Sequence, residues 1–260
     1  MPLSANGPSI PWENKVPAVT FAFWVIKIVS TTVGETGADF LAVNLGLGGA
    51  ATALVMVVLF AGALYFQMRT RTYTPWTYWL TVVLVSIVGT LLTDILTDSL
   101  GVPLTISTAV FAVALLAIFL VWYSVEGTLS IQAITSSRRE SFYWAVILLT
   151  FALGTAAGGL ATEALQLGFA RGAILFGTGI AAVACSYYLG ANAILSFWLA
   201  YVLTRPLGAS LGDLLTQSRQ YGGLGLGTLV TSVLFLIVIL VLVATASRHS
   251  KIASGPTSTA

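Results

Sequence analysis

Eight long apolar stretches follow one another along the chain, separated by short turns that are polar or contain glycine or proline. A helix that crosses a bilayer needs about 20 mostly apolar residues, because it spans roughly 30 Å at 1.5 Å per residue. The stretches that reach this length lie near residues 16–43, 48–67, 75–99, 104–125, 139–166, 170–190, 192–217 and 223–246. The pattern predicts an all-α integral membrane protein with about eight transmembrane helices.

Polar residues gather at the two ends of the chain. We expect a polar N-terminal segment over residues 1–15, a single transmembrane domain over 16–246 and a disordered C-terminal tail over 247–260. The first residues show no basic segment that leads directly into a short apolar core, so no cleavable signal peptide is expected. The first spanning helix is therefore expected to direct membrane insertion.

Four segments resemble one another without gaps: FWVIKIVSTTVGETGADFL, YWLTVVLVSIVGTLLTDIL, YWAVILLTFALGTAAGGLA and FWLAYVLTRPLGASLGDLL. Each begins with an aromatic residue and Trp, and a glycine follows ten residues after the Trp. These glycines are Gly34, Gly89, Gly154 and Gly208. We therefore predict four two-helix repeats, over about 16–70, 71–130, 136–190 and 191–246. Because each repeat contains two spans, all four have one orientation and are parallel repeats.

Composition agrees with a membrane protein. Hydrophobic residues make up 57% of the chain and charged residues 8%, against about 25% charged residues in a typical globular protein. So few charges do not cover the surface of a water-soluble domain. The net charge of +2 is small and scattered, which argues against nucleic acid as a partner. The lipid bilayer is the expected partner.

Basic residues fall mainly on one side of the predicted helices. Seven lie on one side and two on the other when eight helices are counted. The seven are Lys15, Arg69, Arg71, Arg138, Arg139, Arg248 and Lys251, and the two are Arg171 and Arg219. Because cytoplasmic loops are enriched in lysine and arginine, we expect a multi-pass protein of the bacterial inner membrane with both termini in the cytoplasm.

Carboxylates recur at one position of the repeat, five residues after the shared glycine. Asp39, Asp94 and Asp213 occupy this position, and Glu35 lies four residues before Asp39 on the same helix face. A charged group in lipid costs several kcal/mol, so such residues usually face the interior of a bundle and mark an ion pathway. Equivalent acids around a repeat axis would converge on one cavity. We therefore expect Glu35, Asp39, Asp94 and Asp213 to bind a metal ion.

A second acidic position lies four residues further along the repeat and carries Asp98 and Glu163. Asp98 shares a helix face with Asp94, so we include Asp98 among the candidate ligand-binding residues. The acids of both positions lie about 20 residues into their helices, close to the far membrane surface. The alternative is therefore that water reaches them there and that they only cap helix ends.

Two basic residues lie deeper in the predicted helices. Lys27 in the first helix and Arg205 in the seventh are both near mid-membrane, where an unpaired charge is strongly disfavoured. Their partners are expected on neighbouring helices, either as structural counter-ions or in contact with a substrate. The Thr31 hydroxyl, three residues before Gly34, can coordinate a hard cation or bond back to its helix. Lys27, Thr31 and Arg205 complete the candidate ligand-binding set.

The chain offers little for catalysis. Its single cysteine is Cys185 and its single histidine is His249, which argues against a disulfide framework, a histidine-dependent triad and cysteine or histidine zinc sites. No glycine-rich phosphate loop precedes a soluble helix. We expect no enzyme activity and no required cofactor.

The segment KVPAVTFAFWVIKIVSTTVGETGADF and its weaker copies resemble a bacterial family of uncharacterised, membrane-anchored integral membrane proteins. The resemblance covers most of residues 16–246. It implies a membrane location and no settled activity. A looser likeness is to cation exchangers that repeat a Glu-x-Gly-Asp motif on two membrane helices, although Glu35 and Asp39 are spaced differently here and no basic residue follows the aspartate.

These residues favour a small-ion transporter or exporter. Oxygen ligands suit manganese, calcium, magnesium, sodium or protons, so a divalent cation is a candidate substrate. A different hypothesis is a non-transporting scaffold or sensor subunit whose buried charges set helix register. Further alternatives are an ion channel and an anion transporter that uses Lys27 and Arg205. Assembly into a homo-oligomer stays open.

Overall fold

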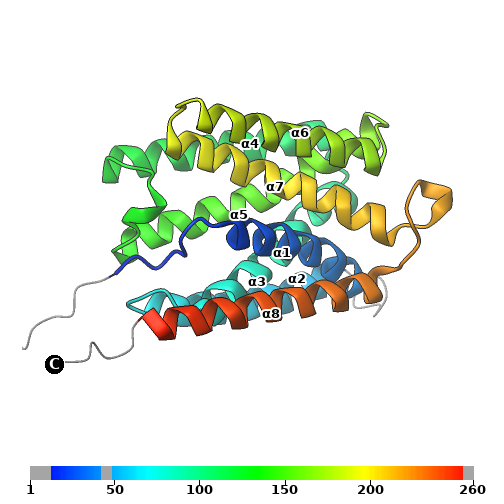
Figure 1. Ribbon diagram of the computed structural model, residues 1–260. Coiled ribbons are helices and arrows are strands. Elements are labelled where there is room, and N and C mark those ends of the chain that lie inside the picture. Colours follow the sequence, from blue (N-terminus) through cyan, green and yellow to red (C-terminus); the bar gives the residue numbers. More distant parts are fainter. Residues whose placement is uncertain (1–12, 42–48, 254–260) are drawn as a thin grey trace, which may run out of the picture.

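The computed structural model describes residues 13–41 and 49–253, and this part of the chain contains eight α-helices and no strand (Figure 1). The helices are α1 (Phe21–Asp39), α2 (Gly49–Arg69), α3 (Pro75–Asp94), α4 (Leu104–Glu126), α5 (Ser137–Gly159), α6 (Phe169–Tyr188), α7 (Ala193–Thr216) and α8 (Thr228–Ala253). The predicted all-α architecture is confirmed. Both described chain ends lie at the same end of the bundle (Figure 1), as an even number of crossings requires.

The first helix begins later than the apolar pattern predicts. α1 starts at Phe21 and not near residue 16. The reason is local, because Thr20 has extended backbone and its hydroxyl accepts a hydrogen bond from the Phe23 N–H at 3.3 Å. A threonine in this role is a helix N-cap, which marks the point where the helix begins.

The last helix is displaced toward the C-terminus. It begins at Thr228 and not near residue 223, because Gly222, Gly225 and Gly227 adopt positive φ angles that are incompatible with a continuing helix. It extends to Ala253, so residues 247–253 of the expected disordered tail are helical. Between Thr228 and Gly255 the sequence contains neither glycine nor proline, which explains the extension.

The four odd-numbered helices form an inner ring and the four even-numbered helices surround it. Each inner helix packs against two others, in the order α1, α3, α5, α7 and back to α1. Each outer helix packs against the inner helix that follows it, so that α2 contacts α3, α4 contacts α5, α6 contacts α7, and α8 contacts α1. The repeats are therefore arranged around one axis, and α8 closes the circle.

The repeated glycines allow the inner helices to approach one another closely. At each glycine, a Cβ atom would lie only 2.2–2.4 Å from a side-chain atom of the next inner helix. The pairs are Gly34 with Ser86, Gly89 with Phe151, Gly154 with Arg205, and Gly208 with Thr31. Each partner lies seven residues after the repeat tryptophan, so the same interlock occurs four times. Small residues have this role in membrane helix packing in general.

Aromatic side chains form a second cyclic contact, near the N-terminal ends of the inner helices. The residue before each repeat tryptophan packs against the tryptophan of the next inner helix, with ring centroids 5.6–6.2 Å apart. The pairs are Phe23 with Trp79, Tyr78 with Trp144, Tyr143 with Trp198, and Phe197 with Trp24. Because equivalent positions meet at two levels, the four inner helices run parallel.

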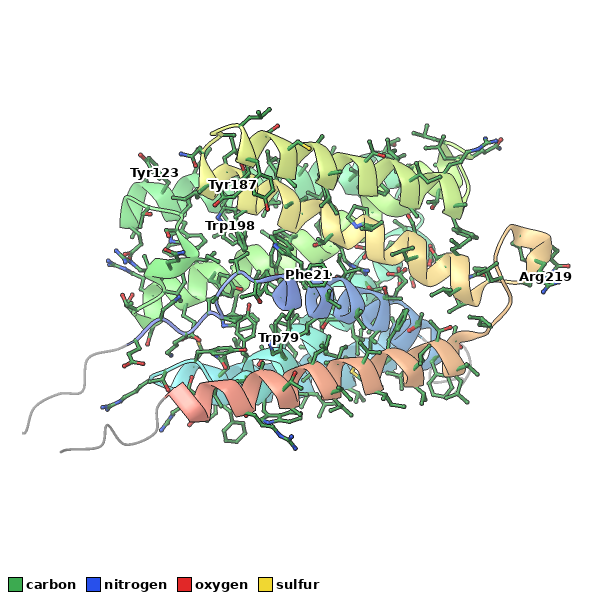
Figure 2. All side chains as sticks on the ribbon, in the orientation of Figure 1. Phe21, Trp79, Tyr123, Tyr187, Trp198 and Arg219 are labelled. Atoms are coloured by element: carbon green, nitrogen blue, oxygen red, sulfur yellow. The ribbon has the colours of Figure 1, made fainter. Side chains whose placement is uncertain are left out.

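We call the N-terminal ends of the inner helices the tryptophan end and their C-terminal ends the aspartate end. In Figure 2, Trp79 and Trp198 lie toward the end marked by Tyr123, and Arg219 lies at the opposite end, beyond α7. The tryptophan end is filled with large buried rings, including Tyr78 and Tyr143, each at most 1% exposed.

Seven helices, α2 to α8, are long and apolar enough to cross a membrane, judged on the described residues alone. α1 has 19 residues and carries Lys27, Glu35 and Asp39. It packs against α3, α7 and α8, and within it Lys27 is 1% exposed and the Glu35 side chain 13% exposed. The outer helices expose apolar side chains such as Val113 and Ile174. The chain is thus a multi-pass membrane protein with a sheltered first helix.

Candidate ion site on the axis of the inner ring

The repeat brings chemically different residues to equivalent depths in the ring. We define three layers by their distance from the repeat tryptophan and name each by one member. The Lys27 layer lies three residues after the tryptophan, the Arg205 layer seven residues after it and the Glu35 layer eleven residues after it. The Lys27 layer contains Lys27, Val82, Ile147 and Tyr201; the Arg205 layer contains Thr31, Ser86, Phe151 and Arg205; the Glu35 layer contains Glu35, Thr90, Thr155 and Ala209. Eleven of these twelve residues are buried, and Glu35 is partly exposed.

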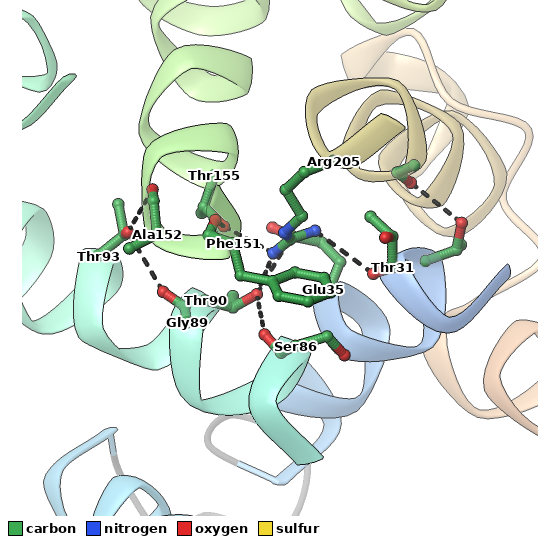
Figure 3. A network of polar contacts seen from close by, with 12 residues as sticks. Thr31, Glu35, Ser86, Gly89, Thr90, Thr93, Phe151, Ala152, Thr155 and Arg205 are labelled. Carbon is green, nitrogen blue, oxygen red and sulfur yellow. Dashed lines mark hydrogen bonds and ion pairs between the residues drawn. The ribbon is translucent and has the colours of Figure 1, made fainter. Parts of the chain in front are cut away.

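Arg205 is fully buried and bonds to all three polar members of the Glu35 layer (Figure 3). Its Nη2 atom lies 2.7 Å from Glu35 Oε2 and 2.6 Å from Thr155 Oγ1, and it also donates to Thr90 Oγ1. The Thr90 hydroxyl donates in turn to Glu35 Oε2 at 3.3 Å. One guanidinium nitrogen therefore lies among three oxygens from α1, α3 and α5. The expected ion-pair partner on a neighbouring helix is confirmed for Arg205.

The second terminal nitrogen of Arg205 anchors the guanidinium to α1. Nη1 donates to the main-chain carbonyl of Thr31 at 3.3 Å. The Thr31 hydroxyl bonds back to its own helix, donating to the Lys27 carbonyl at 2.9 Å. The Arg205 stem crosses the ring because Gly154 leaves room for its Cβ and Cγ atoms. The repeat glycine thus positions the charged group.

Lys27 lies one turn nearer the tryptophan end, among aromatic rings. Its Nζ atom is 4.0 Å from the Phe151 ring centroid and 4.4 Å from that of Tyr201, and it donates to Thr31 Oγ1 at 3.3 Å. The Arg205 Cζ atom lies 5.6 Å from the same Phe151 ring. Within the described residues Lys27 makes no ion pair. Cation–π contacts and one hydroxyl are its polar environment.

Exposure increases along the axis toward the aspartate end. The Arg205 side chain is 0% exposed and that of Glu35 is 13% exposed, whereas Asp94 and Asp213 are half-buried. Both aspartates make polar interactions. The position of the Asp39 side chain lies outside the described structure. Asp94 and Asp213 therefore lie about one helical turn beyond the Glu35 layer, toward the aspartate end.

Asp98 differs from the other candidates. It is exposed, and its carboxylate accepts a hydrogen bond from the neighbouring Thr97 hydroxyl at 3.0 Å. It lies in a π-helical turn, Ile95–Ser99, that continues α3, and an equivalent turn, Leu160–Ala164, continues α5. The wider turn carries Asp98 away from the regular helix face that it would share with Asp94. The structure does not bring Asp98 to the Glu35 layer, and the Glu163 side chain lies outside the described part.

Thr90 and Thr155 are site residues that the sequence reading did not single out. Each directly follows a repeat glycine, as Glu35 does. The position after the repeat glycine thus carries a side-chain oxygen in three of the four repeats, which is a signal present in the sequence. Among the described residues no group of three or more histidine, cysteine, aspartate or glutamate side chains forms a metal cage. The oxygens around Arg205 include only one carboxylate.

A second buried ion pair lies at the tryptophan end. Lys15 Nζ is 2.5 Å from Glu140 Oε2, and both side chains are 1% exposed. Glu140 also accepts a hydrogen bond from Gln67 at 3.2 Å, and Lys15 donates to the Met68 carbonyl at 3.0 Å. The pair ties the segment before α1 to α2 and α5. Lys15 is therefore part of the packed structure and not of a solvated N-terminal segment.

Comparison with known families agrees with the four repeats. A family model with the description Repeat of Unknown Function (DUF347) matches residues 22–73, 77–128, 142–191 and 196–251. Each matched segment covers most of one inner helix and most or all of the outer helix that follows it. No curated protein and no solved structure matches the chain. The cyclic contacts, the repeated glycines and these four matches lead to one conclusion: the chain belongs to the DUF347 repeat family.

Proposed function

We propose that the protein transports a small hard cation and that the Glu35 layer supplies its ligands. The position of the Arg205 Nη2 atom carries this proposal. It lies among one carboxylate oxygen, from Glu35, and two hydroxyl oxygens, from Thr90 and Thr155. Sodium, magnesium, calcium and manganese ions prefer oxygen ligands. A guanidinium nitrogen thus occupies the position that a free cation would take.

In this proposal Arg205 is a tethered cation that competes with the transported one. Without a bound ion, its guanidinium neutralises Glu35, because an unpaired charge inside the membrane is strongly disfavoured. When a cation binds to the Glu35 layer, like-charge repulsion drives the guanidinium away. Arg205 Nε has no hydrogen-bond partner among the described residues, so only the far end of the side chain is held. Displacement of the guanidinium therefore breaks only the contacts of Nη1 and Nη2.

The aspartate end forms one mouth of the proposed route. Asp94 and Asp213 are half-buried there, and carboxylates around an entrance raise the local concentration of cations. The rings of the tryptophan end close the other side, so transport requires that end to open in turn. With the orientation expected from the basic residues, the tryptophan end faces the cytoplasm of a bacterial cell and the aspartate end faces outward.

The experiment compares two valine variants of the purified protein in proteoliposomes. Thr155→Val removes a proposed ligand while keeping side-chain shape, and Thr97→Val is the matched control, because its hydroxyl bonds to Thr93 and Asp98 outside the site. Loss of one oxygen ligand should reduce the binding free energy by about 1–1.5 kcal/mol, so Thr155→Val should bind the cation roughly tenfold more weakly. Flux and thermal stability are measured with sodium, magnesium, calcium and manganese, and Thr97→Val should match the unmodified protein.

Removal of the competitor gives an independent test. Arg205→Gln leaves Glu35 without its counter-ion, so the variant should need a cation for stability. A cation at 100 times its dissociation constant would stabilise it by about 2.7 kcal/mol. Equal behaviour of the two valine variants, together with no cation-dependent stability in Arg205→Gln, would contradict the proposal.

A second candidate is an anion transporter, favoured by the excess of positive groups on the axis. Lys27 and Arg205 are both buried there, whereas Glu35 is the one carboxylate bonded to either within the described residues. The same proteoliposomes, tested for chloride, sulfate and phosphate uptake, distinguish the two. Anion uptake lost in Arg205→Gln, without cation uptake, supports this second candidate, and uptake of neither class supports a scaffold.

A further inference from the structure

Lys27 is a buried amine that the proposed cation site does not use. The groups that face it are the Thr31 hydroxyl, the rings of Phe151 on α5 and Tyr201 on α7, and the Arg205 guanidinium, which shares the Phe151 ring. In the ring interior α3 and α5 also carry the buried phenols of Tyr78 and Tyr143, and α1 carries Glu35. Between its first residue and Ser247, α8 contains no charged residue.

The charge of Lys27 is coupled to occupation of the Glu35 layer. Eight residues separate Lys27 from Glu35, which is about 12 Å along one helix. At this separation and an effective dielectric constant of about 20, a unit charge at one site changes the affinity of the other site for a cation or proton by about tenfold. Because Glu35 is already paired with Arg205, a cation that enters adds positive charge to a region with two cations and one carboxylate. Loss of a proton from Lys27 relieves that excess.

The tryptophan end offers protons a path that is closed to hydrated ions. The Tyr201 hydroxyl is fully buried and interacts with the Tyr143 hydroxyl. Nearer that end, the Tyr78 and Tyr143 hydroxyls lie 2.5 Å apart. Close-packed rings exclude a hydrated cation, whereas phenol hydroxyls can both accept and donate a proton. Tyr201 therefore lies between Lys27 and a pair of hydroxyls that lead away from the cation site.

We propose that Lys27 is the proton-binding site that couples cation binding in the Glu35 layer to proton release toward the tryptophan end. This inference rests on the proposed function. In the coupling step one N–H bond of the Lys27 ammonium breaks, its electron pair stays on nitrogen, and the proton passes through the tyrosine hydroxyls to water. For a monovalent cation the total charge of the bundle does not change. When the cation is loaded through the opened tryptophan end and released at the aspartate end, and Lys27 is reprotonated from the aspartate end, the two ions cross in opposite directions. The protein is then a cation–proton antiporter with one proton exchanged per cycle.

Two substitutions of Lys27 have opposite expected effects. Lys27→Met removes the proton site, so cation flux should continue without proton counterflow and should lose its pH dependence. Lys27→Arg keeps a permanent positive charge, so at every pH its cation affinity should stay about tenfold below that of the unmodified protein with Lys27 deprotonated. In the unmodified protein the apparent cation affinity should change by up to tenfold as Lys27 titrates, because the coupling is reciprocal.

The measurement uses proteoliposomes that contain a pH-sensitive dye, with cation flux followed in parallel. Tyr201→Phe should slow proton counterflow while leaving equilibrium cation affinity unchanged, and Tyr187→Phe, at an exposed position outside the ring, is its matched control. Cation flux without proton counterflow in the unmodified protein, or equal pH dependence in Lys27→Met, overturns this inference and leaves the proposed function intact. Absence of cation binding and flux overturns both.

Discussion

Substitution of alanine for Gly154 tests whether the repeat glycines position the charged site. A Cβ atom at residue 154 would lie 2.2 Å from Arg205 Cγ and 2.4 Å from Arg205 Cβ. Ordinary carbon–carbon contacts are about 3.5–4.0 Å, so α5 and α7 must separate by about an ångström. Because these Arg205 atoms are next to the backbone of α7, rotation of the side chain cannot relieve the contact. The guanidinium must then move relative to Glu35 and Thr155.

The magnitude follows from two opposing terms. Overpacking of a close contact costs about 1–3 kcal/mol, and this contact is at the upper end because near-backbone atoms are involved. Alanine is favoured over glycine inside a helix by about 1 kcal/mol. We therefore expect Gly154→Ala to lower the free energy of unfolding by about 2 kcal/mol.

Gly158→Ala is the matched control, one turn further along α5. A Cβ at residue 158 would lie 3.6 Å from Ala209 Cβ and from Pro206 Cα, which is ordinary contact. The helix-propensity term is the same at both positions, so the two variants should differ by about 3 kcal/mol. Detergent-exchange unfolding in SDS, followed by circular dichroism, measures the difference. Equal stability of the two variants would refute the idea that the glycines set the separation of the inner helices.

Two further results are expected. Glu140→Gln or Lys15→Met alone should destabilise the protein by about 3–5 kcal/mol, because each leaves the other group buried without its partner. The double variant Lys15→Met with Glu140→Leu should recover much of this loss in the same unfolding assay. Asp98→Asn should leave cation flux unchanged and the free energy of unfolding within about 0.5 kcal/mol of that of the unmodified protein. The reason is that Asp98 is exposed and bonds only to its neighbour Thr97 in the described structure. A loss of flux would show that the exposed end of α3 belongs to the ion route.

Part of the candidate site was predictable from the repeat itself. Lys27, Glu35 and Arg205 are unusual because they are charges in apolar segments, and the expectation that the partner of Arg205 lies on another helix is confirmed by its 2.7 Å contact with Glu35. Asp94 and Asp213 lie at equivalent depths, as their shared repeat position requires. Whether they bind a metal ion together with Asp39 stays a prediction.

Other residues gave no charge signal in the sequence. Thr90 and Thr155 are ordinary threonines in apolar helices, and their role depends on an arginine from α7 reaching across the ring. Glu140 and Lys15 have polar neighbours in the sequence, which gave no sign that they are buried. They are buried because residues far apart in the chain, on α2 and before α1, close over them.

The sequence alone determined the membrane class, the helices and the four-fold repeat, because hydrophobic length and residue spacing depend only on the local chain. It also determined that glycine recurs where inner helices must approach. Only the tertiary structure decided which side chains meet, since the order of helices around the ring places Arg205 beside Gly154 and directs it to Glu35. Equivalent positions with different side chains, such as Thr31, Ser86, Phe151 and Arg205, become one asymmetric site only when the four repeats surround a common axis.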